Sequence, residues 1–311
     1  LIDVNLGYIS KAPSIRNTFT NARQNNAVSI GLESEKIQNV DIGYIFRSPI
    51  IKAKITGFYS NFKDGSDLGF YFTENISGLG LEQNAFIQEV MTNIEKQHIG
   101  TELGIEAQVT PTIKLKGAAS MGQYTYHNNP NLYITSDDLD GPISFGDGTT
   151  KLKNYHVAGG PERAYQLGIE YRDPKFWWVG LTTNYYSNTY LDINNLARSD
   201  NFSTDFDGQP FNNYDPEVAK ELLKQEKFDD YFLVNVIGGK SWKIKQYYVG
   251  FFASINNALD QEYVTGGFEQ GRKSSYRDLK EDKLLEYGPI FGPRYFFGTG
   301  GSYYVNVYVR F

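Results

Sequence analysis

The sequence predicts an all-β fold: an antiparallel transmembrane β-barrel segment of about ten strands, with long extracellular loops. Two patterns indicate it. Apolar and polar residues alternate with period two over many short stretches, which is typical of strands with one apolar and one wet face. The connections alternate between tight turns and long segments, as in outer-membrane barrels. An excess of aromatic residues, 24 Tyr and 21 Phe, fits the aromatic girdles at the rims of such a barrel.

The composition of the 311 residues argues against several other classes of protein. Cysteine is absent, which rules out disulfides and cysteine-ligated metals in this chain. The net charge of -6 argues against a nucleic-acid partner, because proteins that bind nucleic acid present a basic face. No run reaches the roughly 18 apolar residues that define a spanning helix. Residue 1 lies inside an alternating run, so we interpret the sequence as mature or as part of something longer.

Ten alternating stretches are the predicted strands. Over residues 51–56, isoleucine and alanine face one side while lysine and threonine face the other. The last stretch is the clearest, because tyrosine and three valines share one face and the chain ends inside it on Phe311. In chain order the predicted strands cover residues 1–9, 38–47, 51–61, 99–109, 113–124, 165–171, 175–187, 230–238, 246–256 and 301–311.

The connections between these strands differ sharply in length. Tight turns rich in Pro, Gly, Asp and Ser are predicted at 47–50, 109–112, 172–175 and 238–241. Long connections lie between them, at 10–37, 63–90, 127–162, 188–228 and 258–300. Because the long ones occupy every second connection, we expect them all on the extracellular side, with Phe311 at the periplasmic side.

One long connection is expected to hold a short helix. Asp215 is a suitable N-cap and Pro216 suits the first helical position, so the helix should cover residues 216–226. Its apolar residues Val218, Leu222 and Leu223 should pack onto the neighbouring loops.

Four short motifs in order resemble one family. Residues 7–14 read GYISKAPS, residues 32–36 and 41–44 read LESEK and DIGY, and residues 255–263 read INNALDQEY. The terminal aromatic Phe311 matches the outer-membrane assembly signal. Together they resemble the barrel of TonB-dependent outer-membrane receptors, with Ser34 where the family has Pro and Asp41 where it has Glu. The loops resemble those of Bacteroidota members and of SusC-like transporters.

The resemblance implies a 22-stranded barrel preceded by a plug and a TonB box. This chain would be a single segment, 1–311, that supplies the last ten strands, with the plug and TonB box absent from it. It implies an integral protein of the bacterial outer membrane that imports a bulky solute, either an iron-siderophore or an oligosaccharide or peptide. The implied partners are TonB, through the missing N-terminal part, outer-membrane lipids, the barrel-assembly machinery and a SusD-like surface lipoprotein.

Aromatic side chains in and beside the long loops are candidate substrate contacts, because their rings stack on sugar or siderophore rings. The candidates are Tyr124, Tyr126, Tyr133, Tyr185, Tyr186, Tyr190 and Phe211. Those nearest the strands would serve equally well in a rim girdle. We expect selectivity in the loops 127–162, 188–228 and 258–300, because the strands must satisfy lipid and one another.

Charged residues on the wet faces of the strands are expected to line the lumen. They could form a solute path, or they could hydrogen-bond a plug or one another. These residues are Lys52, Lys54, Glu102, Glu106, Lys114 and Lys116. Trp177 and Trp178 directly follow a tight turn, so we interpret them as anchors at the periplasmic rim.

Little in the sequence indicates a metal site, a cofactor or a catalytic centre. The segment with Asp138 and Asp140 resembles half of a calcium loop, but no bidentate Glu follows at the required spacing, so an acidic turn is favoured. His98, His127 and His156 are scattered along the chain, which favours separate roles. We therefore expect no enzyme and no cofactor.

Two alternative functions stay open. A transporter-like barrel could serve as a scaffold in an outer-membrane protein complex. A complete ten-stranded outer-membrane protease would need paired Asp and His at the extracellular rim, and only His127 or His156 near Asp137 or Asp138 could supply them.

Overall fold

The computed structural model describes residues 1–79, 84–137 and 139–311. In this part of the chain, ten long strands form one antiparallel sheet in the order β1-β2-β3-β4-β5-β7-β8-β9-β10-β13. Their bounds are β1 Ile2–Lys11, β2 Glu35–Arg47, β3 Ile51–Thr73, β4 Ala85–Gln108, β5 Ile113–Tyr126, β7 Arg163–Arg172, β8 Trp177–Ser187, β9 Tyr231–Ile244, β10 Tyr247–Asn256 and β13 Ser302–Arg310. The predicted antiparallel barrel segment is confirmed, and each of the ten alternating stretches is a strand.

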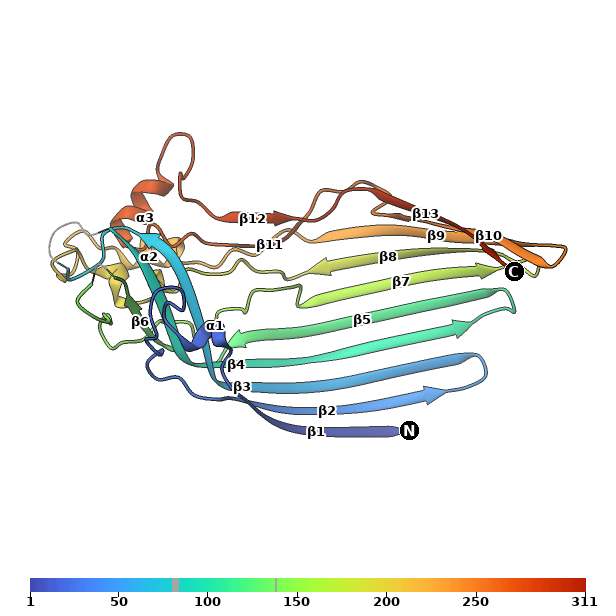
Figure 1. Cartoon of the computed structure of the whole chain (residues 1–311), viewed down its shortest axis with the longest axis horizontal. Helices are drawn as coiled ribbons and strands as arrows, with labels where there is room; N and C mark the ends of the chain where they lie inside the picture. Colours follow the sequence, from blue (N-terminus) through green and yellow to red (C-terminus); the bar gives the residue numbers. More distant parts are fainter. Residues whose placement is uncertain (80–83, 138) are drawn as a thin grey trace.

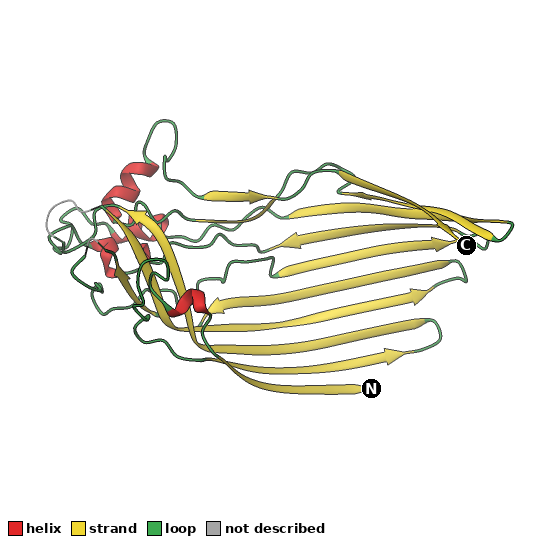
Figure 2. Ribbon diagram, viewed as in Figure 1, coloured by secondary structure: helices red, strands yellow, loops and turns green. Residues whose placement is uncertain are grey.

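The sheet is curved and open, with its termini and short turns at one end (Figures 1 and 2). Among the described strands, β1 pairs with β2 alone and β13 pairs with β10 alone, so both outer strands keep unpaired backbone groups. The helices and long connections gather at the opposite end. This is the predicted division into short periplasmic turns and long extracellular loops. No helix in the described residues is long and apolar enough to span a membrane.

The register places apolar side chains on the convex face of the sheet and polar ones on the concave face. Between β10 and β13, Phe251 lies opposite Val307 on the convex side, and Val307 is 69% exposed. On the concave side, the Lys54 Nζ lies 3.2 Å from Asp3 Oδ2. Similar ion pairs join Lys116 to Glu170 at 2.9 Å and Lys114 to Glu106 at 3.1 Å. These ion pairs therefore join charges on different strands: β3 with β1, β5 with β7, and β5 with β4.

The turn predicted at residues 238–241 is wrong. These residues lie inside β9, and the turn to β10 falls at Lys245, whose φ is 55°. The two glycines serve close strand packing instead: a Cβ at Gly239 would lie 2.6 Å from the backbone oxygen of Phe251, and one at Gly238 would lie 2.9 Å from that of Trp178. Glycine therefore lets the neighbouring strands approach here.

The long connection predicted at 63–90 is largely strand. Residues 63–73 and 85–95 continue β3 and β4 beyond the rest of the sheet, with irregular register after Phe62 and Gly65. Figure 1 shows these extensions bending over the extracellular end. A short strand, β6 (Asn131–Thr135), pairs with the extension of β4. Side chains such as Ile87 and Val90 are buried in the extension, so a packed core replaces lipid there.

Helices and two further short strands complete the extracellular end. They are α1 Ile15–Thr18, η1 Leu196–Arg198, η2 Asp200–Ser203, α2 Pro216–Leu222, α3 Tyr276–Lys283, β11 Val264–Phe268 and β12 Arg294–Phe297. The predicted N-cap of α2 is confirmed, since the Asp215 side chain accepts hydrogen bonds from the backbone of Glu217 and Val218. The helix ends at Leu222, earlier than predicted. Helix α3 was not predicted, although Ser275 caps it by accepting from the backbone of Asp278.

We call the packed extracellular body the loop mass (residues 12–34, 63–79, 84–95, 127–137, 139–162, 188–230 and 257–301). One of its two buried clusters includes Ile76, Ile87, Leu132, Ile134, Leu152 and Leu196. The other joins Phe202, Phe211 and Tyr276, and the predicted α2 residues Val218, Leu222 and Leu223 pack against it. The long connections therefore form a body with its own hydrophobic core.

Candidate functional site

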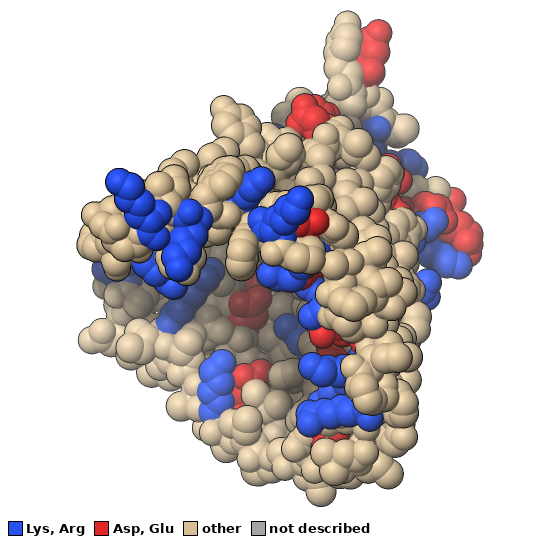
Figure 3. All heavy atoms as spheres, turned by 90° about the vertical axis from the view of Figure 1, so that its right-hand side faces the viewer, with Lys and Arg blue, Asp and Glu red and all other residues tan. Residues whose placement is uncertain are grey.

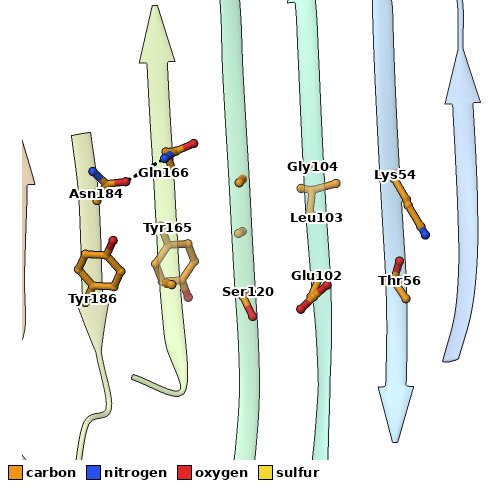
Figure 4. A pocket seen from close by; sticks show the side chains of 13 residues that line it. Lys54, Thr56, Glu102, Leu103, Gly104, Ser120, Tyr165, Gln166, Asn184 and Tyr186 are labelled. Atoms are coloured by element: carbon orange, nitrogen blue, oxygen red, sulfur yellow. Dashed lines mark hydrogen bonds between the residues drawn. The ribbon is translucent and has the colours of Figure 1, made fainter. Parts of the chain in front are cut away.

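The concave face of the sheet contains a hollow of about 440 Å³ (Figure 4). Polar side chains from five strands lie around it, including Lys54, Thr56, Glu102, Ser120, Gln166 and Asn184. The Gln166 amide donates to the Asn184 side-chain oxygen at 3.0 Å. Figure 3, seen from the periplasmic end, shows that Lys and Arg gather around the mouth of the concave face. We call this region the concave hollow.

A second cavity, of about 550 Å³, lies at the extracellular rim and is called the rim pocket here. Tyr231 and Tyr263 stack in it, with ring centroids 4.4 Å apart. Tyr231 also contacts Tyr186 of the concave hollow, at 5.1 Å between ring centroids, so the linings of the two cavities touch at this pair. Carboxylates surround the rings: Glu226, Asp229, Asp230 and Glu262.

Hydrogen bonds from tyrosines orient two of the rim carboxylates. The Tyr295 hydroxyl donates to Glu226 Oε2 at 2.9 Å, and the Tyr185 hydroxyl donates to Asp230 Oδ2 at 2.6 Å. Burial and the nearby Glu226 raise the pKa of the Tyr295 hydroxyl to about 12. The hydrogen bond from Tyr185 lowers the pKa of the Asp230 carboxyl, so this group stays ionised at neutral pH.

The predicted aromatic contacts fall into two groups: four are at least partly exposed, and three are buried. Tyr186 lines the concave hollow, and the Tyr124 ring packs at 4.6 Å against His98. Tyr190 stacks on His156 at 3.7 Å, at the edge of the loop mass. Tyr185 lies on the opposite face of β8 from Tyr186, where its hydroxyl reaches Asp230.

The other three aromatic candidates are buried. Tyr126, Tyr133 and Phe211 are 8%, 7% and 8% exposed, respectively. Tyr126 belongs to the first hydrophobic cluster and Phe211 to the second, while the Tyr133 hydroxyl accepts from the backbone of Ile30. Because stacking on a solute requires an open ring face, these three stabilise the loop mass rather than form its surface. The segment after β8 is likewise internal, since Leu191 and Leu196 are fully buried.

A buried polar network, which the sequence did not predict, holds the loop mass together. Arg198 forms an ion pair with Glu269, and its Nη2 lies 2.9 Å from Glu269 Oε1. Glu89 accepts hydrogen bonds from Tyr71 and from Asn195, the latter at 2.9 Å. Burial raises the pKa of Glu89 despite those hydrogen bonds. No sequence signal was available, because the partners lie far apart along the chain.

The candidate calcium ligands remain a prediction. Asp138 lies outside the described residues, and Asp140 is exposed. In the parts of the chain that the structure describes, no three His, Cys, Asp or Glu side chains form a group suited to a metal ion. His98 lies between the rings of Phe62 and Tyr124, whereas His156 Nδ1 is 2.7 Å from Glu162 Oε1. These two histidines therefore occupy separate surroundings.

The periplasmic rim carries the predicted terminal features. Trp177 begins β8 directly after the turn, packs at 4.9 Å against Tyr171 and is partly exposed. Trp178 points to the other face, where the Arg172 guanidinium lies over its ring. Phe311 follows β13 and is 95% exposed. Its role as an assembly signal stays a prediction.

An open antiparallel wall with an apolar convex face, a polar concave face and all its long connections at one end defines a transmembrane β-barrel protein. The chain belongs to the family described as TonB dependent receptor-like, beta-barrel, whose model matches residues 4–258. It is an integral protein of the outer membrane. The resemblance seen in the sequence motifs is thus confirmed at the level of the family.

Solved structures of transporters and receptors share the fold. A copper transporter, OprC, is 15% identical with a TM-score of 0.55, and the match covers 98% of this chain and 36% of that one. The ferric preacinetobactin receptor BauA from Acinetobacter baumannii is 12% identical with a TM-score of 0.51, covering 99% of this chain and 34% of that one. The ferric yersiniabactin uptake receptor FyuA from Yersinia pestis is 12% identical with a TM-score of 0.50, covering 98% and 34%.

At these identities the similarity concerns the fold alone. The chain spans about a third of the length of these solved structures. No curated protein matches the sequence.

Proposed function

We propose that this chain supplies the barrel wall and the extracellular binding surface of a TonB-dependent importer of bulky solutes. The plug and the contact with TonB are assigned to sequence outside these 311 residues. The family match supports the transport class, and the similar structures are transporters and receptors rather than enzymes. An iron-siderophore is one candidate cargo and an oligosaccharide or peptide is the other. A SusD-like lipoprotein and the barrel-assembly machinery remain proposed partners.

One observation carries the proposal: the linings of the concave hollow and the rim pocket touch. Tyr186 of the hollow contacts Tyr231 of the pocket, so we infer that a solute path runs from the extracellular rim along the inside of the wall. A solute captured at the rim can therefore pass along hydrogen-bonding groups such as Gln166 and Asn184. Transporters need this kind of surface, because a polar solute must keep partners while it leaves water.

The test compares uptake by cells that carry the full-length receptor, with and without TonB. We expect accumulation of a ferric siderophore or an oligosaccharide only when both proteins are present. Ala118→Trp should lower uptake, because Ala118 lies opposite Gln166 on the concave face. Ala253→Trp is the matched control, since Ala253 lies opposite Val305 on the convex face and does not line the concave hollow.

Two results would contradict the proposal. One is solute accumulation that is unchanged in cells without TonB. The other is a full-length protein that accumulates none of these solutes yet purifies within a stable outer-membrane complex, which would favour the scaffold function.

A further inference from the structure

The charges of the chain are divided unevenly between its two ends. Most of the 36 acidic residues lie in the loop mass, whereas the 30 basic residues are shared equally between the loop mass and the strands with their short turns. The extracellular end is therefore strongly negative, and the wall is net positive. A negative field at the entrance raises the local concentration of cations and disfavours anions.

The rim pocket concentrates this negative charge beside aromatic rings. Lys227 is the only basic residue among the described residues that line it, and its Nζ lies 3.5 Å from Asp230 Oδ1. The side chains of Asp229 and Glu262 have no hydrogen-bond or ion-pair partner in the described part of the chain, and both are exposed. At least two carboxylates are thus available to a ligand.

The aromatic rings supply a second attraction for a cation. The Tyr231 and Tyr263 stack forms one wall of the pocket, and Tyr295 and Phe297 lie in its lining too. An ammonium or guanidinium group is attracted to the face of an aromatic ring within about 6 Å. A pocket that combines ring faces with unpaired carboxylates selects a cation over a neutral group of similar shape, because only the cation gains from both.

We propose that the rim pocket binds a cationic group, an ammonium or a guanidinium, carried by the imported solute. This inference deepens the proposed function and rests on it, since it names the chemical class of the cargo. The contact from Tyr231 to Tyr186 places the pocket beside the concave hollow, so the cation would be captured next to the inner surface. An anionic solute would meet repulsion at the same place.

The test measures binding of spermidine, a triamine, to the purified full-length receptor in detergent by calorimetry. Asp229→Asn with Glu262→Gln removes the two unpaired charges and keeps the side-chain shapes. We expect spermidine affinity to fall about tenfold or more, which corresponds to about 1.4 kcal/mol. Asp207→Asn with Glu221→Gln is the matched control, because it removes the same charge from exposed sites outside the pocket.

The control should weaken binding by less than about twofold, because screening by salt leaves little interaction at a distance. A second variant, Tyr263→Leu, should also lower affinity through loss of the ring face. Equal losses in the two double variants would overturn the pocket as the site. Binding of maltohexaose but not spermidine, abolished by Tyr263→Leu, would overturn the cationic class in favour of a neutral glycan.

Uptake assays separate this inference from the proposed function. Spermidine binding that depends on the pocket, without any TonB-dependent uptake, would reject import and leave the cation site standing. TonB-dependent uptake of a cationic solute that is unchanged in the pocket variant would reject the site and leave import standing.

Discussion

The wall and the loop mass differ in where they place their apolar side chains. In the wall, Val307 and Phe251 lie opposite each other on the convex face, and both side chains are exposed in this chain. We expect lipid to cover them in the membrane. In the loop mass, Ile134 and Leu196 are fully buried among residues from distant connections. The wall depends on strand register and on the membrane, whereas the loop mass depends on its own core.

This difference separates two sources of stability. Each strand of the wall is fixed by neighbours that follow a period-two pattern, so a single substitution acts through the face on which it lies. The loop mass instead relies on contacts between residues far apart in the sequence, such as the Arg198–Glu269 ion pair. A substitution there should unfold the loop mass and leave the wall in place.

The largest effect is expected at Arg198. Arg198→Met removes a buried guanidinium that bonds Glu269, the Leu223 carbonyl and the Asn194 carbonyl. Breaking a buried ion pair on one side costs about 3–5 kcal/mol. Hydrogen exchange should therefore accelerate across residues 190–230 while the strands stay protected. Arg16→Met, an exposed arginine, is the control. Equal acceleration in wall and loops would show that the two regions unfold together.

The next effect concerns the wall. Val307→Arg places a charge on the membrane face and should cost about 2–4 kcal/mol near the bilayer midplane. Asn306→Arg, one residue away, points to the concave face and should cost much less. Denaturant titration of the full-length protein in lipid vesicles measures both. Similar costs for the two variants would contradict the assignment of the faces.

The smallest effect is expected at Glu89. Burial chiefly raises its pKa, so ionisation of Glu89 disfavours the folded loop mass. The stability that Glu89 contributes is present at low pH and is lost as the pH rises through its raised pKa. Glu89→Gln should therefore stabilise the loop mass at pH 8 and change little at pH 4.5. Thermal melting of the loop mass at both values tests this, and a variant that is less stable at pH 8 would be the opposite result.

The wall could be predicted from the sequence because its rules are local. Alternation alone located all ten strands, and the lengths of the connections identified the two ends. The error at Gly238–Ser241 arose because glycine indicates a turn and close strand packing equally well. The extensions of β3 and β4 were missed because the residues Lys63–Asp67 have the composition of a loop.

The loop mass could be predicted only in part. Asp215 and Pro216 indicated helix α2 through local chemistry. Ser275 followed by Asp278 is a comparable local signal for α3. The burial of Tyr126, Tyr133 and Phe211 depends on partners that sequence order does not reveal. The rim pocket likewise joins residues 226–231 and 261–264 with Tyr295 and Phe297, which no local pattern brings together.

The most direct test of a lipid-facing wall is the accessibility of alternate residues along β13. The 311 residues contain no cysteine, so single cysteines with spin labels can be placed from Val305 to Val309 in a cysteine-free full-length receptor in vesicles. We expect oxygen, which partitions into lipid, to relax the labels at Val305, Val307 and Val309. A water-soluble nickel complex should reach the labels between them. Relaxation by the nickel complex at Val307, and at Phe251 opposite it, would contradict a wall that faces lipid.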